Sequence, residues 1–413
     1  MERYSEYKDS GIQWIGEIPS HWEARKMKYI FIERSEKNHP NEPVLCATQS
    51  QGVIPQSIYT NRVVVVNKGF DGLKFVKEGD FVISLRSFEG GIEYAYYQGI
   101  ISAAYTILVP NRKAESNYWR YLFKSHPFIQ LLKTCVTGIR EGQNINYPLL
   151  SRKFLPVPPL SEQERIVKFL EGKVLKIDEY IADKEREIQL LKEIKEAEIA
   201  KAVTQGLNPN VKMKDSGIPW IGMIPEHWET TKINSVFKER REKVSDKIYP
   251  PLSVSKQGIT PQLESAVKTD NGDNRKKVNE GDFVVNSRSD RKGSCGISPY
   301  TGSVSLINIV LQPRSDIEGK YFHFLFRSNN YIEEYYRIGR GIVADLWTTR
   351  YSEMRNIIVP IPPIGEQRAI VNYIDTKCSK VDSLVTELEA EIEHLKEYKQ
   401  RLIADCVTGQ IKV

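Results

Sequence analysis

Two stretches decide the fold: Lys8–Glu23 reads KDSGIQWIGEIPSHWE, and Lys214–Glu229 reads KDSGIPWIGMIPEHWE. Thirteen of these 16 positions are identical, and the offset of 206 residues is half of the 413-residue chain. A second pair follows at an offset of 204, LPVPPLSEQERIV (Leu155–Val167) and VPIPPIGEQRAIV (Val359–Val371). Repetition on this scale indicates a duplicated domain, because solenoid repeats have periods of about 20–50 residues. The sequence therefore predicts an internal pseudo-two-fold axis, which suits a nearly two-fold target such as duplex DNA.

The composition is that of a folded protein without a membrane span. Its 40% hydrophobic and 10% aromatic content is ordinary for globular domains. No stretch approaches the roughly 18 apolar residues that a membrane helix needs. The charged start MERYSEYKDSG lacks the apolar core of a signal peptide, so we expect the protein to be located in the cytoplasm. Five scattered cysteines without a C-x-x-C motif predict reduced thiols rather than a disulfide scaffold or a zinc site.

Each half is expected to be a mixed α/β (α+β) globular domain followed by a long helix. Gly, Asn and Pro punctuate β-rich runs in both halves, as in strands joined by turns; these runs are Arg62–Val66, Asp80–Leu85, Ala104–Pro110, Asp282–Asn286 and Ser305–Pro313. Shorter helices are predicted at Tyr118–Thr134 and Lys320–Arg337. The predicted division is 1–155 for the first globular domain, 156–207 for a proline exit and first long helix, 208–358 for the second domain, and 359–413 for the second exit and helix.

The long helices are predicted to pair with each other. Ser161 is the expected N-cap of the first, and Gly365 takes the corresponding place in the second. Apolar residues then recur at heptad-like spacing: Leu170, Val174, Ile177, Ile181, Ile188 and Leu191 in one helix, and Ile370, Ile374, Val381, Leu384, Leu388, Ile392 and Leu395 in the other. A two-fold relation predicts antiparallel pairing, with the globular domains at opposite ends of a rod. The alternative is two separate surface helices.

Positive charge is concentrated outside the two long helices. Ser161–Gln205 holds 9 Lys/Arg and 11 Asp/Glu, and Gly365–Thr408 holds 6 and 9. The net charge is +6, so the other 324 residues carry +11. This distribution favours globular domains that face a polyanion.

The order of the two repeated motifs closely resembles that of DNA-specificity subunits of type I restriction–modification systems, over essentially the full chain. The resemblance implies two target recognition domains, separated by two long antiparallel coiled-coil helices that also dock two methyltransferase subunits. It further implies that those subunits bring S-adenosylmethionine and methylate adenines, while restriction subunits bring ATP and Mg. No cofactor is expected in this chain.

Three loop clusters in each half carry the Arg, Lys, Asn and Gln side chains that read base edges or hold phosphates. In the first half they contain Gln49, Ser50 and Gln51; Arg86 and Ser87; and Arg140, Gln143, Asn144 and Asn146. In the second half they contain Lys256 and Gln257; Arg288, Ser289, Arg291 and Lys292; and Arg340 and Arg350. The alternative for each is a turn-forming amide or a solvated charge. Arg86 and Arg288, which recur directly after a strand, could instead form internal salt bridges.

The sequence offers no catalytic motif. There is no [DN]-P-P-[YFW] adenine-methylation motif, and Tyr249–Leu252 (YPPL) lacks its polar residue. There is no G-x-x-x-x-G-K-[ST] phosphate loop. We therefore predict a non-catalytic reader of a bipartite DNA site. The alternatives are a coiled-coil adaptor that scaffolds proteins without reading sequence, a stand-alone nuclease or methyltransferase, and an RNA-binding protein.

Overall fold

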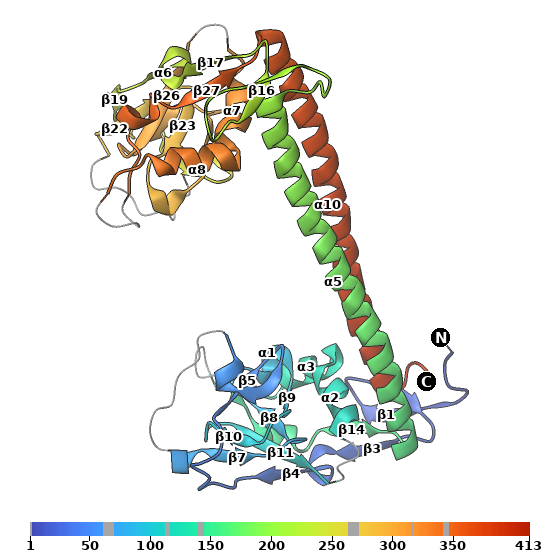
Figure 1. Ribbon diagram of the computed structural model, residues 1–413. Coiled ribbons are helices and arrows are strands. Elements are labelled where there is room, and N and C mark those ends of the chain that lie inside the picture. The colour runs from blue at the N-terminus through green and yellow to red at the C-terminus, as the bar shows by residue number, and fades with distance from the viewer. Residues whose placement is uncertain are drawn as a thin grey trace. The chain divides into compact units, whose positions relative to one another are not determined.

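The computed structural model describes residues 2–60, 70–111, 116–138, 144–262, 272–314, 317–341 and 347–413. These form two compact units. Unit 1 comprises Met1–Lys184 and Glu389–Val413, and unit 2 comprises Glu185–Leu388. Each unit thus contains one globular domain with a part of each long helix (Figure 1). None of the helices in the described ranges is long and apolar enough to cross a membrane.

Unit 1 is built on a four-stranded antiparallel sheet of order β4-β11-β8-β9. Its strands are β4 (Phe31–Arg34), β11 (Thr106–Pro110), β8 (Phe81–Ile83) and β9 (Glu93–Tyr94). Successive residues of β8 enter different cores, as strand geometry requires. Phe81 and Ile83 pack with helices α2 (Ser116–Lys124) and α3 (His126–Lys133), while Val82 packs in a smaller core with Leu45 and Val53.

Unit 2 repeats this arrangement with the sheet order β18-β26-β23-β24. Its strands are β18 (Phe237–Glu239), β26 (Asn308–Pro313), β23 (Phe283–Asn286) and β24 (Cys295–Ile297). Phe283 and Val285 pack with α7 (Gly319–Arg327) and α8 (Asn329–Arg337), and Val284 lies in the smaller core. The same strand order and the same alternation between a larger and a smaller core establish the duplication in the fold.

The remaining strands form small antiparallel sheets around each main sheet. In unit 1 they are β1 (Tyr7–Ile12), β2 (Gly16–Pro19), β3 (Glu23–Lys26), β5 (Leu45–Thr48), β6 (Gly52–Pro55), β7 (Lys74–Val76), β10 (Gly99–Ile101), β12 (Val136–Thr137), β13 (Asn144–Ile145) and β14 (Phe154–Val157), with helices α1 (Ser87–Gly90) and α4 (Tyr147–Leu150). In unit 2 they are β15 (Met213–Asp215), β16 (Met223–Pro225), β17 (Glu229–Lys232), β19 (Lys243–Val244), β20 (Leu252–Ser255), β21 (Gly258–Pro261), β22 (Arg275–Val278), β25 (Gly302–Val304) and β27 (Ile358–Ile361), with helices α6 (Ile233–Val236) and α9 (Tyr351–Met354).

The predicted strands are confirmed where the structure describes them, whereas Arg62–Val66 lies outside the described residues. The two predicted shorter helices are wrong as single elements, because each is divided into two. Ser125 and Ser328 mark the breaks, with extended backbone (ψ of 144° and 143°), and each buried hydroxyl donates to the carbonyl three residues earlier at 2.7 Å. These bonds satisfy helix-terminal carbonyls inside the core.

The two long helices are α5 (Leu160–Gln205) and α10 (Ile364–Val407). Both begin before the residues predicted to cap them, so Ser161 lies in the first turn and is not the N-cap. The predicted seam positions are buried or partly buried except Leu384, which is 39% exposed. Val385 is buried instead, because the seam advances four residues from Val381 before the next step of three.

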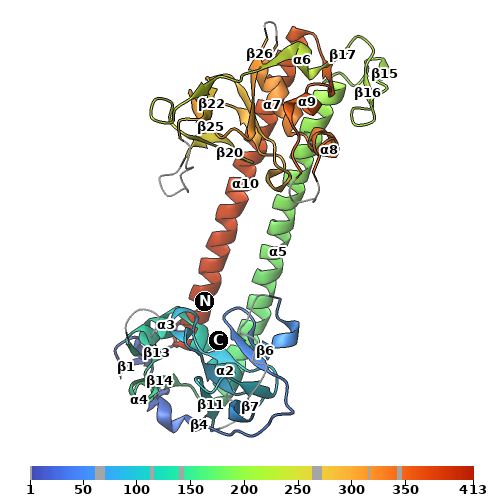
Figure 2. The same cartoon turned by 90° about the vertical axis from the view of Figure 1, so that its left-hand side faces the viewer.

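Figure 2 shows the α5 and α10 ribbons. Within each unit these helix segments run antiparallel, as their side-chain contacts establish. In unit 1, Lys399 contacts Asp178 at 2.5 Å and Lys184 contacts Glu391 at 3.3 Å. In unit 2, Lys195 contacts Asp382 at 2.6 Å, and the Tyr373 hydroxyl donates to Glu198 at 2.7 Å. In both units the partner's residue number falls as the α5 number rises, which confirms the predicted direction of pairing.

The repeated motifs attach each globular domain to the start of its own long helix. His21 contacts Glu162 at 2.8 Å in unit 1, and His227 contacts Glu366 at 2.5 Å in unit 2. Glu162 also accepts from the Tyr4 hydroxyl, while Glu366 accepts from Trp228 Nε1 at 2.8 Å. The motif histidines therefore bind carboxylates of the second motif.

The end of the other long helix is attached by a tyrosine. Tyr118 of α2 donates to the Val407 carbonyl of α10 at 2.7 Å, and Tyr321 of α7 donates to the Val203 carbonyl of α5 at 2.8 Å. Both tyrosines are fully buried, so each bond satisfies a carbonyl near a helix end that lacks an intrahelical partner. Each globular domain is thus hydrogen-bonded to the start of one long helix and to the end of the other.

Candidate nucleic-acid interface

The first candidate cluster is the tip of a tight hairpin in both units. In unit 1, Gln49, Ser50 and Gln51 are exposed between β5 and β6, and the Thr48 hydroxyl accepts from the Gln51 N–H at 3.0 Å. In unit 2, Lys256 and Gln257 are exposed between β20 and β21, where Ser255 accepts from the Gln257 N–H at 3.2 Å. A small hydroxyl residue closes each turn, and the longer side chains are exposed, although the Gln49 amide also donates to Glu89 at 3.5 Å.

The second cluster of unit 1 is the turn after β8. Arg86 is exposed at the start of the short helix α1. Ser87 is 1% exposed, and its hydroxyl accepts from the Ser84 N–H at 2.8 Å. That burial argues against the prediction that Ser87 contacts DNA, because its side chain is engaged in closing the turn.

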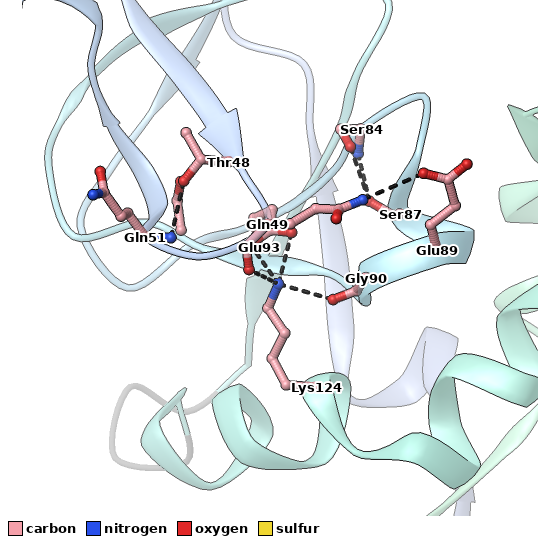
Figure 3. A network of polar contacts seen from close by, with 10 residues as sticks. Thr48, Gln49, Gln51, Ser84, Ser87, Glu89, Gly90, Glu93 and Lys124 are labelled. Carbon is pink, nitrogen blue, oxygen red and sulfur yellow. Dashed lines mark hydrogen bonds and ion pairs between the residues drawn. The ribbon is translucent and has the colours of Figure 1, made fainter. Parts of the chain in front are cut away.

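Lys124 joins the first cluster to the second (Figure 3). It stands at the last position of α2, and its Nζ donates to the Gln49 carbonyl at 3.1 Å and to the Gly90 carbonyl at 2.9 Å. The same atom lies 2.7 Å from both carboxylate oxygens of Glu93 on β9. Burial raises the pKa of Glu93 to about 7, against the opposing effect of the Lys124 charge. The hairpin tip and the turn after β8 are therefore held side by side.

Arg327 occupies the position of Lys124 in unit 2 and likewise binds the hairpin tip. It ends α7, and its guanidinium donates to the Cys295 carbonyl at 2.8 Å and to the carbonyl of Lys256 at the hairpin tip. Gly296 occupies the position of Glu93, since it pairs with Val284 as Glu93 pairs with Val82 in unit 1, so this position supplies no carboxylate to Arg327. His323 lies against Gly296 and accepts from the Ile297 N–H at 3.3 Å. Burial and the nearby Arg327 charge lower the pKa of His323 to about 4, so it is neutral at pH 7.

The second and third clusters of unit 2 are joined through their backbones. Arg288 and Arg340 both pair with Thr348 in isolated antiparallel bridges. The Ser289 N–H also donates to the Trp347 carbonyl at 2.9 Å. Arg288 and Arg340 are exposed, and Trp347 is 38% exposed. The structure therefore brings two arginines and an aromatic ring to one surface.

The other cations of this surface differ in how free they are. Arg291 is exposed and its guanidinium lies 3.6 Å from the neighbouring Asp290 carboxylate, and Arg350 is exposed at the start of α9. Lys292 is instead engaged with Glu333 at 2.5 Å. Arg291 is thus better placed than Lys292 to meet a phosphate.

The third cluster of unit 1 is described only in part. Arg140 and Gln143 lie outside the described residues. Asn144 is exposed on β13, which contacts α1 of the second cluster. Asn146 accepts from the Leu149 N–H at 3.0 Å and so caps α4. Its Oδ1 is thus engaged in capping, and a DNA contact by Asn146 stays a prediction.

The internal salt bridges that were an alternative for Arg86 and Arg288 are made by other arginines. Arg34 contacts the buried Asp80 at 3.0 Å, and Arg240 contacts the buried Asp282 at 2.7 Å. Within the described ranges, Arg86 and Arg288 form no ion pair of this kind. Both side chains remain available to solvent.

Sequence reasoning missed Lys124 and Arg327. Their only signal was position, since both end the corresponding strings YWRYLFK and YFHFLFR. The tryptophans of the repeated motif belong to the cores: Trp22 and Trp228 are fully buried, and Trp14 and Trp220 pack against the same cores. In the part of the chain that the structure describes, no group of three or more His, Cys, Asp or Glu could hold a metal ion.

The fold and these paired loops define a protein with two related recognition domains and two long helices, with each domain attached to both helices. The family model for the type I restriction modification DNA specificity domain matches residues 16–190 and 225–394, one match in each half. The chain therefore belongs to the family of type I restriction–modification specificity subunits.

Known proteins agree with this assignment. A type I restriction enzyme specificity subunit of Methanocaldococcus jannaschii, provisionally assigned as MjaX, is 25% identical and covers 97% of this chain and 96% of its own length. The EcoBI specificity subunit of Escherichia coli is 23% identical over 63% of this chain and 59% of its own. Among solved structures, a chain of a type I restriction–modification system aligns with a TM-score of 0.67 at 16% identity, covering 95% of this chain and 99% of that chain. The HsdS subunit of Thermoanaerobacter tengcongensis aligns with a TM-score of 0.53 at 15% identity, covering 95% and 98%. These two alignments support the fold.

Proposed function

We propose that this chain reads a bipartite, asymmetric DNA site, with one half-site for each globular domain. The observation that carries this proposal is the recurrence of one loop arrangement in both units. Each unit joins an exposed hairpin tip, through a cation that ends a helix, to the segment that follows the second sheet strand in sequence; the bound carbonyl is that of Gly90 in α1 of unit 1 and that of Cys295, the first residue of β24, in unit 2. Two copies of one reading surface in one chain suit two half-sites in successive major grooves.

The charges of the domains support DNA as the ligand. Residues outside the two long helices carry +11, and Arg86, Arg288, Arg291, Arg340 and Arg350 are exposed. Such side chains hold phosphates, and the same residue types read base edges when they enter a groove. A protein-only adaptor, the alternative function, gives these loops no role.

The residues at the two hairpin tips favour different half-sites. Unit 1 presents the amides of Gln49 and Gln51, and Gln pairs best with adenine N6 and N7. Unit 2 presents Lys256 beside Gln257, and Lys pairs with guanine O6 and N7. We therefore propose an asymmetric site, with the unread spacer set by the helices.

Catalysis is assigned to partner subunits in this proposal. Two methyltransferase subunits would supply S-adenosylmethionine and flip adenines into their own pockets for N6 methylation. Restriction subunits would supply ATP- and Mg-dependent cleavage. The proposed location of the complex is the cytoplasm, where the host DNA lies.

The test is a domain exchange in the assembled methyltransferase. Residues 1–155 are replaced by the corresponding domain of another specificity subunit, and methylated adenines are mapped across a bacterial genome. We expect one half-site to change and the other to stay. A change in both half-sites, or in neither, contradicts modular reading.

A second measurement separates reading from scaffolding. The wild-type complex, without the domain exchange, is titrated with a duplex that contains the mapped site and with a scrambled duplex of equal length, at several salt concentrations. Tighter, salt-dependent binding of the mapped site is expected. Equal affinity for both duplexes would favour the adaptor.

A further inference from the structure

We propose that Lys124 and Arg327 are positioning residues for base reading: each fixes the hairpin tip of its domain to the segment that follows the second sheet strand, and so sets the half-site specificity of that domain. This inference rests on the proposed function. Neither residue belongs to the exposed clusters that would touch DNA, so their effect would be exerted through loop geometry.

Both cations bind main-chain oxygens of two segments that are distant in sequence. Lys124 reaches the carbonyls of Gln49 and Gly90, which are 41 residues apart in the chain. Arg327 reaches the carbonyls of Lys256 and Cys295, which are 39 apart. The recurrence in two domains with different loop sequences indicates a device for holding the loops in register.

Lys124 has no donor left for a phosphate. An ammonium group has three N–H donors. Here they serve the Gln49 carbonyl, the Gly90 carbonyl and the Glu93 carboxylate, all within 3.1 Å. A direct DNA contact by Lys124 would require one of these bonds to break, so a role within the protein fits the geometry better.

The joined loops are also close-packed, which makes the position of the cation consequential. A Cβ added at Gly90 would lie 2.8 Å from the Gln49 side chain, and one added at Gly91 would lie 2.2 Å from the Phe123 carbonyl. Hydrogen bonds to base edges need donor–acceptor distances of about 2.7–3.2 Å. A loop released from its cation would move the reading side chains outside that range.

The test uses the full chain assembled with its methyltransferase subunits, after the wild-type site has been mapped. Methylation rates are measured on the mapped site and on duplexes with one base changed in either half-site. We expect Lys124→Met to lower discrimination about tenfold at the half-site read by unit 1 and to leave the other unchanged. Arg327→Met should do the reverse, and Lys124→Arg should restore most of the discrimination.

Matched controls remove the same charge from neighbouring helices. Lys133→Met at the end of α3 and Arg337→Met at the end of α8 should leave discrimination at both half-sites unchanged. Hydrogen exchange gives a second readout: Lys124→Met should speed exchange in residues 49–52 and 84–91 together, with no change in the unit 2 loops. If Lys124→Met does not fold, Lys124→Gln decides, because its amide can serve one carbonyl but cannot hold both loops.

The outcomes separate this inference from the proposed function. A wild-type complex without sequence preference refutes the proposed function. A wild-type complex that reads its site, together with a Lys124→Met complex of unchanged discrimination, refutes only the positioning role. Equal loss at both half-sites also refutes it, since that result would reflect general damage.

Discussion

Replacing Glu93 with Gln should remove a pH dependence of stability from unit 1. The Glu93 side chain is 2% exposed, and burial raises its pKa from 4.5 to about 7. A folded-state pKa above the unfolded value means that the folded chain binds the proton more tightly. The stabilisation is therefore fully present below about pH 4.5 and is lost as the pH rises through about 7.

The shift corresponds to about 3 kcal/mol between the two limits. Between about pH 8.5 and pH 5.5, the free energy of unfolding of the wild type should rise by about 2 kcal/mol relative to Glu93→Gln. The variant lacks the titrating group, so its own stability should show none of this contribution.

Denaturant-dependent hydrogen exchange of the β8 and β11 amides in the full chain measures unit 1 separately. The control is Glu89→Gln, since Glu89 is an exposed carboxylate on α1, next to the same network. Its stability should follow the wild type at every pH. Parallel curves for wild type and Glu93→Gln would refute the assignment of a raised pKa to Glu93.

Three further predictions concern the helix attachment, the loop backbone and the charge of the interface. Glu162→Ala should lower the free energy of unfolding by about 3 kcal/mol and Glu366→Ala by about 1 kcal/mol, because the Glu162 side chain is 4% exposed and that of Glu366 is 42% exposed; equal losses in denaturant titrations would contradict this. Gly91→Ala should lower the free energy of unfolding by about 2 kcal/mol, because Gly91 has a φ of +88° and no room for a Cβ. Gly172 lies inside α5 with open space around it, so Gly172→Ala should raise the free energy of unfolding by about 0.5–1 kcal/mol, measured by thermal unfolding. Arg291→Gln should weaken DNA binding by the assembled complex and reduce the slope of log K against log salt by about one; an unchanged slope would exclude a phosphate contact.

The sequence predicted the architecture because the features that specify it are periodic or repeated. The two motif pairs located the duplication, and the heptad spacing located the helix seam. It failed at Leu384, where a spacing of three or four from Val381 was equally compatible with the pattern. It also missed the division of the shorter helices, because a single buried serine supplies the break.

The candidate site was predictable only at the level of loops. Exposed Gln, Lys and Arg at turns were found from composition, but Ser87 and Asn146 proved to be engaged in local backbone hydrogen bonds. Lys124 and Arg327 escaped notice because their acceptors are mostly main-chain carbonyls, which every residue possesses. Such contacts leave no trace in the identity of the partner residues.

That indifference to side-chain identity has an evolutionary consequence. A mutation at Gln49 or Lys256 alters what the hairpin tip presents, yet the carbonyl that anchors it survives any substitution. Under the proposed function, new specificities would therefore arise by single changes on an unchanged scaffold, without a compensating mutation elsewhere. Directed evolution that randomises residues 49–51 or 256–257 while keeping Lys124 and Arg327 should accordingly yield folded proteins at high frequency.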